Sequence, residues 1–255
     1  MLLDMPRRVS LAAAASAQQI IAAAFASGKG GIWIDASQTS SLWQDAARTI
    51  PVSAPGDPVL AFDDLSGNGN HSYSFSSAAV YDVVSGVGQI RQTSRGHLWQ
   101  VHSSYPNIST IYIAAALGYT STDAYGRLWS LAWETNNTFD YQDPTGVMCN
   151  ATSAGVVVGR NNGNYGMSPR QAVPQSFWVD YFGTHLTQSA VVNGTAYDFA
   201  VTPETVLSWQ RLWLGYAGTR GVDLRLRELV IVHDWTPTAA ERATIQAHMA
   251  AKAAA

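Results

Sequence analysis

The pattern of apolar and polar residues changes character near residue 31. Beyond that point, short apolar runs, many with period-two alternation, are separated by clusters of Gly, Pro, Asn, Asp and Ser, which is typical of strands and turns. The expected strands are 32–34, 59–62, 79–84, 98–101, 110–117, 128–133, 156–158, 177–182, 189–192, 211–215 and 223–233. Because no expected helix separates them, the pattern predicts a mainly β fold of two packed antiparallel sheets.

Two segments of this pattern give more specific predictions. Asn193-Gly194, between two apolar runs, indicates a hairpin with a type I′ turn, in which both central residues have positive φ. The last expected strand alternates from Val222 to Arg227, which predicts an apolar inner face and a charged, half-solvated outer face. Residues 229–232 are apolar on both faces, so this half of the strand is expected to be covered on both sides.

Helices are expected only at the two ends of the chain. Residues 9–25 are good helix formers with a thin, mostly alanine apolar face, so this helix must dock on its own domain or on another protein. Residues 27–31, Ser-Gly-Lys-Gly-Gly, are expected to end the helix and to form a flexible joint.

A second helix is predicted after the last strand. Thr238 and Glu241 have the spacing of a capping box, and Ile245 and Met249 form one apolar stripe toward the sandwich. The predicted organisation is therefore a helical arm and joint at 1–30, a sandwich at 31–235 and a C-terminal helix at 236–255.

Composition narrows the class of protein. The 255 residues suit one large β domain, and with 47% apolar and 13% charged residues much of the surface is expected to be covered by neighbouring chains, as in a homo-oligomer. A net charge of −3 without a basic stripe argues against nucleic-acid binding. The lone Cys149 excludes an intrachain disulfide and a multi-cysteine metal site, and we expect it to be a buried thiol.

The beginning of the chain resembles a signal peptide in outline. Arg7-Arg8 precede an Ala-rich run that ends near Ala26-Ser27. Gln18 and Gln19 interrupt that run, which favours an uncleaved protein made in the cytoplasm. No segment is long and apolar enough to predict a membrane span.

Residues 31–71 contain four recognisable sequence segments: W-I-D-A-S, L-W-Q-D-A, P-G-D-P-V and D-L-S-G-N-G-N-H. They resemble the opening strands of laminin-G-like, concanavalin A-like jelly rolls found in tailed-bacteriophage structural proteins. Further along, F-W-V at 177–179, V-V-N-G-T at 191–195, L-W-L-G-Y at 212–216, the strand 224–233 and T-A-A-E-R at 238–242 are similar to the closing order of that family.

This resemblance implies a two-sheet antiparallel jelly-roll sandwich with an N-terminal helical arm and a short C-terminal helix. It also implies a structural or binding component of a phage virion, displayed on the head or tail as a decoration, spike or fibre. Residues 1–28 would contact other virion proteins, and a host surface glycan is the candidate ligand. Two alternatives stay open: a secreted carbohydrate-active enzyme or carbohydrate-binding module, and a bacterial surface adhesion domain.

A glycan-cleaving enzyme of this fold class needs paired carboxylates across a cleft. The glutamates are scattered, and no G-x-S-x-G motif is present. Glu134 with Asp140 or Asp143 is the best remaining pair, and a solvated loop explains these acids better. We therefore predict a protein without catalytic residues.

Calcium is the candidate cofactor. Asp63, Asp64, Asn68 and Asn70 offer the oxygen atoms that this ion prefers, and relatives of the laminin-G type carry calcium at such a rim. The same four residues also satisfy a tight turn without a metal, which is the preferred interpretation.

Aromatic side chains are the candidate glycan contacts, since their faces stack on sugars. The sandwich core is the alternative for each of them. The candidates are Trp129, Trp133, Trp178, Tyr119, Tyr125 and Tyr165.

Overall fold

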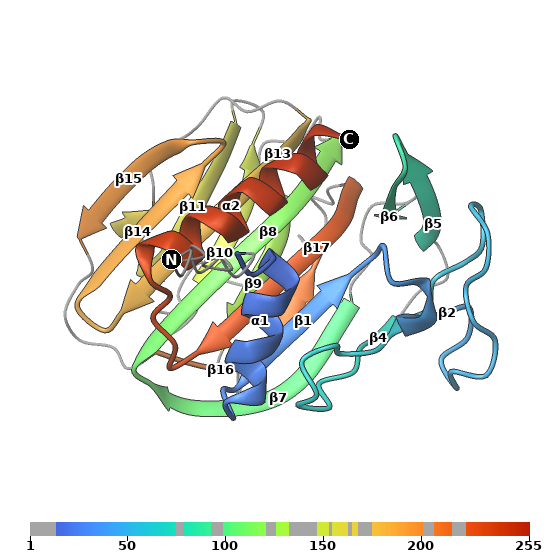
Figure 1. Ribbon diagram of the computed structural model, residues 1–255, viewed down its shortest axis with the longest axis horizontal. Helices are drawn as coiled ribbons and strands as arrows, with labels where there is room; N and C mark the ends of the chain where they lie inside the picture. Colours follow the sequence, from blue (N-terminus) through green and yellow to red (C-terminus); the bar gives the residue numbers. More distant parts are fainter. Residues whose placement is uncertain are drawn as a thin grey trace, which may run out of the picture.

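The computed structural model describes residues 14–74, 79–92, 99–120, 126–132, 147–152, 155–162, 165–167, 175–200, 207–215 and 223–255. Two antiparallel sheets face each other, and one helix from each end of the chain lies on the outside of one sheet (Figure 1). The predicted jelly-roll β-sandwich with terminal helices is confirmed. Within the described residues, no helix has the length and apolar character needed to cross a membrane.

We call the sheet that carries the helices the first sheet. In spatial order it contains β15 (Thr195–Ala200), β14 (Thr187–Val192), β13 (Ser176–Thr184), β8 (Thr110–Thr120), β17 (Asp223–His233), β6 (Val87–Gln92) and β5 (Ala79–Val84), while β1 (Gly31–Asp35) also pairs with β17. Strands distant in sequence are neighbours here, as expected for a sandwich with crossing connections.

The second sheet lies opposite the first. Its order is β12 (Tyr165–Met167), β11 (Gly155–Asn162), β10 (Val147–Thr152), β9 (Gly126–Ala132), β16 (Leu207–Leu214), β7 (Trp99–Ile108) and β4 (Tyr73–Ser74). A small ribbon of β2 (Leu42–Trp43) and β3 (Ala61–Phe62), preceded by a short 3₁₀ turn at Thr39–Ser41, lies beside them.

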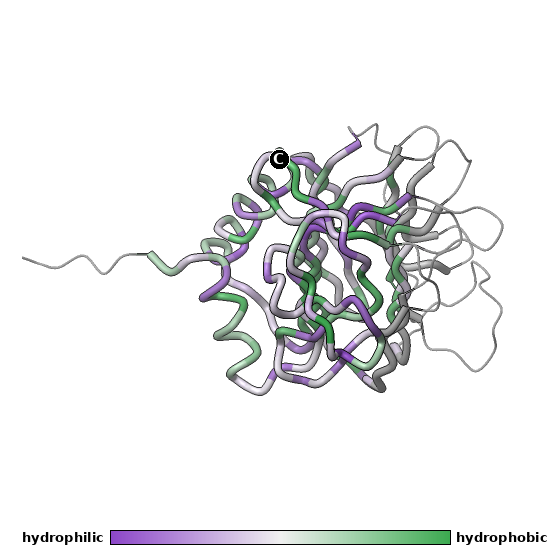
Figure 2. Tube along the Cα trace, turned by 90° about the vertical axis from the view of Figure 1, so that its right-hand side faces the viewer, coloured by the Kyte–Doolittle hydropathy of each residue, from purple (hydrophilic) through white to green (hydrophobic). Residues whose placement is uncertain are grey.

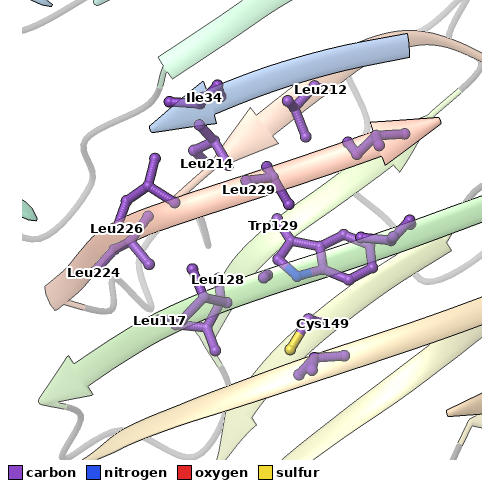
Figure 3. Packing of buried hydrophobic residues seen from close by; sticks show 14 of the residues in the cluster. Ile34, Leu117, Leu128, Trp129, Cys149, Leu212, Leu214, Leu224, Leu226 and Leu229 are labelled. Atoms are coloured by element: carbon purple, nitrogen blue, oxygen red, sulfur yellow. The ribbon is translucent and has the colours of Figure 1, made fainter. Parts of the chain in front are cut away.

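The main core fills the space between the two sheets. Leu117 and Leu229 from the first sheet and Trp129 and Leu212 from the second belong to one buried apolar cluster (Figure 3). Cys149 pairs with Trp129 across β10 and β9 and is fully buried, so the predicted buried thiol is confirmed. Burial raises the pKa of this thiol, which makes it unreactive.

A second apolar cluster lies on the outer face of the first sheet. Ile21 of α1 (Ala17–Ala26) and Ile245 and Met249 of α2 (Ala239–Ala254) pack there against Tyr112 and Val230. Figure 2, turned by 90° from Figure 1, shows both helices on one side of the sandwich. The N-terminal helix was expected to dock either on its own domain or on another protein, and the structure shows it docked on its own domain.

Both helices begin at a capping box. At α2, Thr238 and Glu241 exchange the expected pair of hydrogen bonds, which confirms that prediction. At α1, Ser16 and Gln19 form an equivalent pair that sequence analysis did not identify, and the helix begins at Ala17 rather than near residue 9. Residues 1–13 lie outside the described residues.

The joint between α1 and β1 is tightly packed, in contrast to the predicted flexible link. Gly31 has φ 135°, and a Cβ atom there would lie 1.9 Å from the carbonyl oxygen of Ile231. A Cβ atom at Gly30 would lie 2.8 Å from Cε1 of Tyr105 and 3.1 Å from Nδ1 of His233. These glycines therefore allow a close approach of β1 to β17 rather than free rotation.

The Asn193-Gly194 turn joins β14 to β15 as predicted. Its φ values are 47° at Asn193 and 86° at Gly194, so both central residues are in the left-handed region that a type I′ turn requires.

Strand β17 follows its predicted pattern except at one residue. Both faces are covered from Leu229 to Val232, as expected. The expected half-solvated position of Arg227 is wrong, because a bulge between Leu226 and Glu228 disturbs the alternation and Arg227 is only 2% exposed.

Candidate functional site

The turn after β3 contains the predicted calcium ligands, and Asp64 is its buried centre. Its Oδ1 accepts hydrogen bonds from the backbone N–H of Trp33 at 3.0 Å and of Ser66 at 2.9 Å. Its Oδ2 accepts from Ser66 Oγ at 2.7 Å and from the Asn70 N–H at 3.0 Å. Both carboxylate oxygens therefore serve the turn and its attachment to β1.

The two asparagines of this turn also bond to the protein itself. Asn68 and Asn70 donate their Nδ2 groups to the Gly31 carbonyl at 3.1 and 2.7 Å, and Asn70 Nδ2 also contacts Tyr105 Oη at 2.7 Å. Across the part of the chain that the structure describes, no three His, Cys, Asp or Glu side chains are grouped as metal ligands. These contacts favour the turn interpretation, and calcium binding stays a prediction.

Asp63 points away from this turn into a half-exposed group of polar side chains. It accepts a hydrogen bond from Trp43 Nε1 at 2.8 Å, forms an ion pair with Arg48 Nε at 3.0 Å and lies 3.4 Å from His71 Nδ1. The side chains of Arg48, Asp63 and His71 are 30%, 28% and 45% exposed, so water reaches all three. We call Trp43, Arg48, Asp63 and His71 the rim cluster.

Backbone geometry brings the rim cluster together. The pairing of Trp43 with Ala61 in β2 and β3 places the indole beside Asp63. Arg48 has φ 56°, a sparsely populated conformation for a non-glycine residue. It is held there by Asp45, whose Oδ1 accepts from the N–H groups of Thr49 and Ile50; the Ile50 bond is the main cause of a lowered pKa of Asp45.

The rim cluster combines a half-buried aromatic ring with a carboxylate, a guanidinium and an imidazole. Such a set can hydrogen-bond hydroxyl groups while an apolar surface contacts a sugar ring. A single carboxylate does not supply the acid and nucleophile pair of a glycosidase. Sequence analysis missed Trp43 and Arg48, because only the long-range pairing of β2 with β3 places them beside Asp63.

The aromatic candidates occupy different positions. Trp129 is fully buried and Tyr119 is 8% exposed, so both belong to the main core and neither offers a face to a sugar. Trp178 is half-buried beside the outer cluster. Tyr165 lies in β12, where only the backbone is described, and Trp133 and Tyr125 lie outside the described residues, as do Glu134, Asp140 and Asp143.

Buried carboxylates lie between α2 and the first sheet. Asp180 accepts from Arg242 Nε at 2.5 Å and from Tyr112 Oη at 2.8 Å. Burial, and then the Asp180 charge, raise the pKa of Tyr112 well above its ordinary value, so this phenol stays a hydrogen-bond donor. This group fastens the first turn of α2 to β13.

A second buried network fastens the other end of α2. Lys252 Nζ lies 2.5 Å from Asp35 Oδ1 and 2.6 Å from Glu228 Oε2, which also contacts His248 Nε2 at 2.7 Å. Trp33 Nε1 donates to Glu228 Oε1 at 2.9 Å. Burial opposes ionisation of Glu228, but the His248 hydrogen bond and the Lys252 charge together lower its pKa, so it is a carboxylate here.

Comparison with known proteins gives matches in structure only. No protein-family model and no curated protein matches the sequence. An arabinofuranosidase complexed with arabinofuranosyl-α-1,2-xylobiose has a TM-score of 0.62 at 12% identity, over 91% of this chain and 65% of that chain. The binding domain of botulinum neurotoxin DC, solved with rat synaptotagmin II, gives 0.55 at 10% identity over 76% and 51%.

A sialidase of Trypanosoma rangeli is also similar, with a TM-score of 0.55 at 10% identity over 89% of this chain and 33% of that chain. The present chain thus spans less than two thirds of the arabinofuranosidase that it matches. Identities this low show the fold alone. The chain has a β-sandwich fold that also occurs in carbohydrate-active proteins.

Proposed function

We propose that this protein is a β-sandwich module that binds carbohydrate without cleaving it. The observation that carries the proposal is the likeness of almost the whole chain to sandwiches of an arabinofuranosidase and a sialidase. The rim cluster supplies suitable chemistry, because Trp43 offers an aromatic surface next to the charged, half-exposed groups of Arg48 and Asp63.

The described acids support binding more than hydrolysis. Hydrolysis of a glycosidic bond uses two carboxyl groups placed on either side of that bond. Asp63 belongs to the rim cluster, but both oxygens of the adjacent Asp64 accept hydrogen bonds from the turn or from β1. Asp180 and Glu228 are buried in ion pairs beneath α2. A carbohydrate-active enzyme is the second candidate, favoured by the glycosidase neighbours.

The finer proposal places this module in the virion of a tailed phage, in contact with host surface glycans. It is supported by the sequence segments of residues 31–71, which resemble those of phage jelly rolls, and by the similar order of the segments from 177 to 242. Because α1 docks on its own sheet, contacts with other virion proteins would use residues 1–16 and the exposed side of α1, which includes Gln19 and Ala22. The alternative is an adhesion domain on a bacterial surface. Mass spectrometry of purified phage particles distinguishes the two, because only a virion protein would be found in the particles.

The binding proposal is tested with a panel of immobilised bacterial surface polysaccharides, with and without calcium. Retention and the release of reducing ends are measured on the same samples. We expect retention without release, and about tenfold weaker retention for Trp43→Ala and Asp63→Asn, equivalent to about 1.4 kcal/mol. Asp198→Asn is the matched control, since Asp198 is an exposed carboxylate on β15.

Two outcomes would count against this function. Absence of retention on every polysaccharide would refute carbohydrate binding. Sustained release of reducing ends that disappears in Glu134→Gln would show a glycosidase instead.

A further inference from the structure

On one part of the outer face of the first sheet, arginine side chains lie where neither helix packs. Ser176 on β13 pairs with Gly118 on β8, Gly118 with Arg225 on β17, and Arg225 with Arg91 on β6. Residues directly opposite one another in antiparallel strands point to the same side of a sheet. That side is the outer one, because the alternate neighbours Leu117, Leu226 and Ile90 lie in the main core.

Arg227 joins this row from the bulge in β17. It is 2% exposed, its Nη1 donates to the Leu117 carbonyl at 3.4 Å, and its Nη2 donates to Ser176 Oγ at 3.2 Å. Its Nε has no hydrogen-bond partner. A buried guanidinium with an unused N–H is costly, because its lost hydration is not replaced.

This arginine pair forms no ion pair within the described part of the chain. Neither Arg225 nor Arg227 forms an ion pair there with a carboxylate. Asp82 instead lies 3.6 Å from Arg91, and Glu228 is engaged with Lys252. Burial, and then repulsion from Arg225, lower the pKa of Arg227, so an added anion would relieve both effects.

Gly118 positions the second guanidinium. A Cβ atom at this glycine would lie 3.3 Å from both Cβ and Cδ of Arg225, so the arginine side chain lies over the backbone of β8. This direction leads toward Ser176, the residue that Arg227 contacts. Trp178 follows Ser176 by two positions, on the same face of β13, and is half-buried.

We propose that Arg225 and Ser176 bind the anionic group of an acidic saccharide, while the buried guanidinium of Arg227 adds positive charge behind Ser176. Guanidinium groups bind planar carboxylates, and also sulfate or phosphate, through paired N–H donors. The half-buried Trp178 lies where the apolar face of a sugar ring can contact it. This inference rests on the proposed carbohydrate binding and names the ligand class, at a site separate from the rim cluster.

The test uses isothermal titration calorimetry of the full-length protein with four probes: a galacturonate tetramer, its fully methyl-esterified form, a sulfated chondroitin tetramer and inorganic phosphate. We expect an acidic tetramer to bind at least about tenfold more tightly than the ester or phosphate. Arg225→Gln should weaken that binding about tenfold while the protein stays folded, because Arg225 is half-exposed. Lys29→Gln removes the same charge in the joint before β1, away from this row, and should leave binding unchanged.

The outcomes separate this site from the general proposal. Equal affinity of Arg225→Gln and the unmodified protein would overturn the site. Phosphate binding as tightly as an acidic tetramer would overturn the saccharide assignment. Retention of neutral polysaccharides with no preference for acidic ones would leave the proposed function standing and refute this inference, whereas no saccharide binding at all would refute both.

Discussion

The outer face of the first sheet has two parts, and among the residues that the structure describes, buried charges are paired in one of them but not in the other. Beneath α2, the carboxylates of Asp180 and Glu228 each contact a cationic side chain at hydrogen-bonding distance. Around Arg225 and Arg227, no carboxylate is paired with either guanidinium within the described residues. Removing one partner of a buried pair leaves an uncompensated charge, so loss of either partner beneath α2 should destabilise the domain, whereas loss of an unmatched arginine should not.

The largest effect is expected from breaking the network at the C-terminal half of α2. Glu228→Ala would leave Lys252, His248 and the Trp33 indole without their shared acceptor and should lower the free energy of unfolding by about 3–5 kcal/mol. Urea denaturation measures this loss. Asp198→Ala, at an exposed position, should change stability by less than about 0.5 kcal/mol. A similar small loss for Glu228→Ala would mean that apolar contacts alone hold α2.

Apolar docking of α1 is expected to contribute next. Ile21 is fully buried in the outer cluster, so Ile21→Ala should cost about 2–4 kcal/mol by the same urea measurement. Ile20→Ala is the matched control, since Ile20 is only partly buried, and it should cost clearly less. Equal losses at the two positions would show that the helix is not docked in this orientation.

A hairpin at the edge of the first sheet tests backbone conformation without involving either charged region. Gly194→Val forces a β-branched residue to φ 86° and should cost about 1–3 kcal/mol, although no atom lies within 4 Å of the added Cβ. Thr195→Val, at an exposed position beside it, is the control. An unchanged melting temperature for Gly194→Val would show that the turn is misassigned.

His233 differs from both charged regions, because its buried imidazole is neutral. It is buried, accepts a hydrogen bond from Trp209 Nε1 at 2.7 Å, and burial lowers its pKa from 6.5 to about 3. The unfolded chain therefore binds a proton that the folded state excludes between these pH values. Its contribution to stability is complete above about pH 6.5 and declines as the pH falls toward 3.

Because the pKa of His233 is lowered, the free energy of unfolding should fall modestly in mild acid. Between pH 7 and pH 5.5, His233 should account for about 1 kcal/mol of lost stability. The check is a comparison of urea midpoints at these two values for the unmodified protein and for His233→Gln. The variant should lose less, and an identical pH dependence would contradict the assignment of a neutral buried imidazole.

Local patterns were sufficient to predict two packed antiparallel sheets with terminal helices, because their signals lie close together in sequence. Thr238 and Glu241 are three residues apart, and Asn193 adjoins Gly194, so each pair identifies its own cap or turn. The alternation of apolar residues likewise indicates which side of a strand faces the core, and β17 follows it at Leu224, Arg225 and Leu226.

The candidate sites could not be predicted in the same way, because they depend on long-range packing. The rim cluster exists only because β2 pairs with β3, which brings Trp43 to Asp63. The bulge that buries Arg227 has no signature in the alternation of residues 224–227. The joint appeared flexible because it is rich in glycine, whereas the Asn70 amide holds its Gly31 carbonyl.

The most direct test of the contrast between matched and unmatched charge compares two substitutions that each remove one buried cation. Lys252→Met leaves Asp35 and Glu228 without their shared partner, and it should lower the free energy of unfolding by about 3–5 kcal/mol. Arg227→Met removes a guanidinium that no described carboxylate neutralises, and the variant should be as stable as the unmodified protein or more stable. A loss for Arg227→Met as large as that for Lys252→Met would contradict the account, because it would show that both cations are structural.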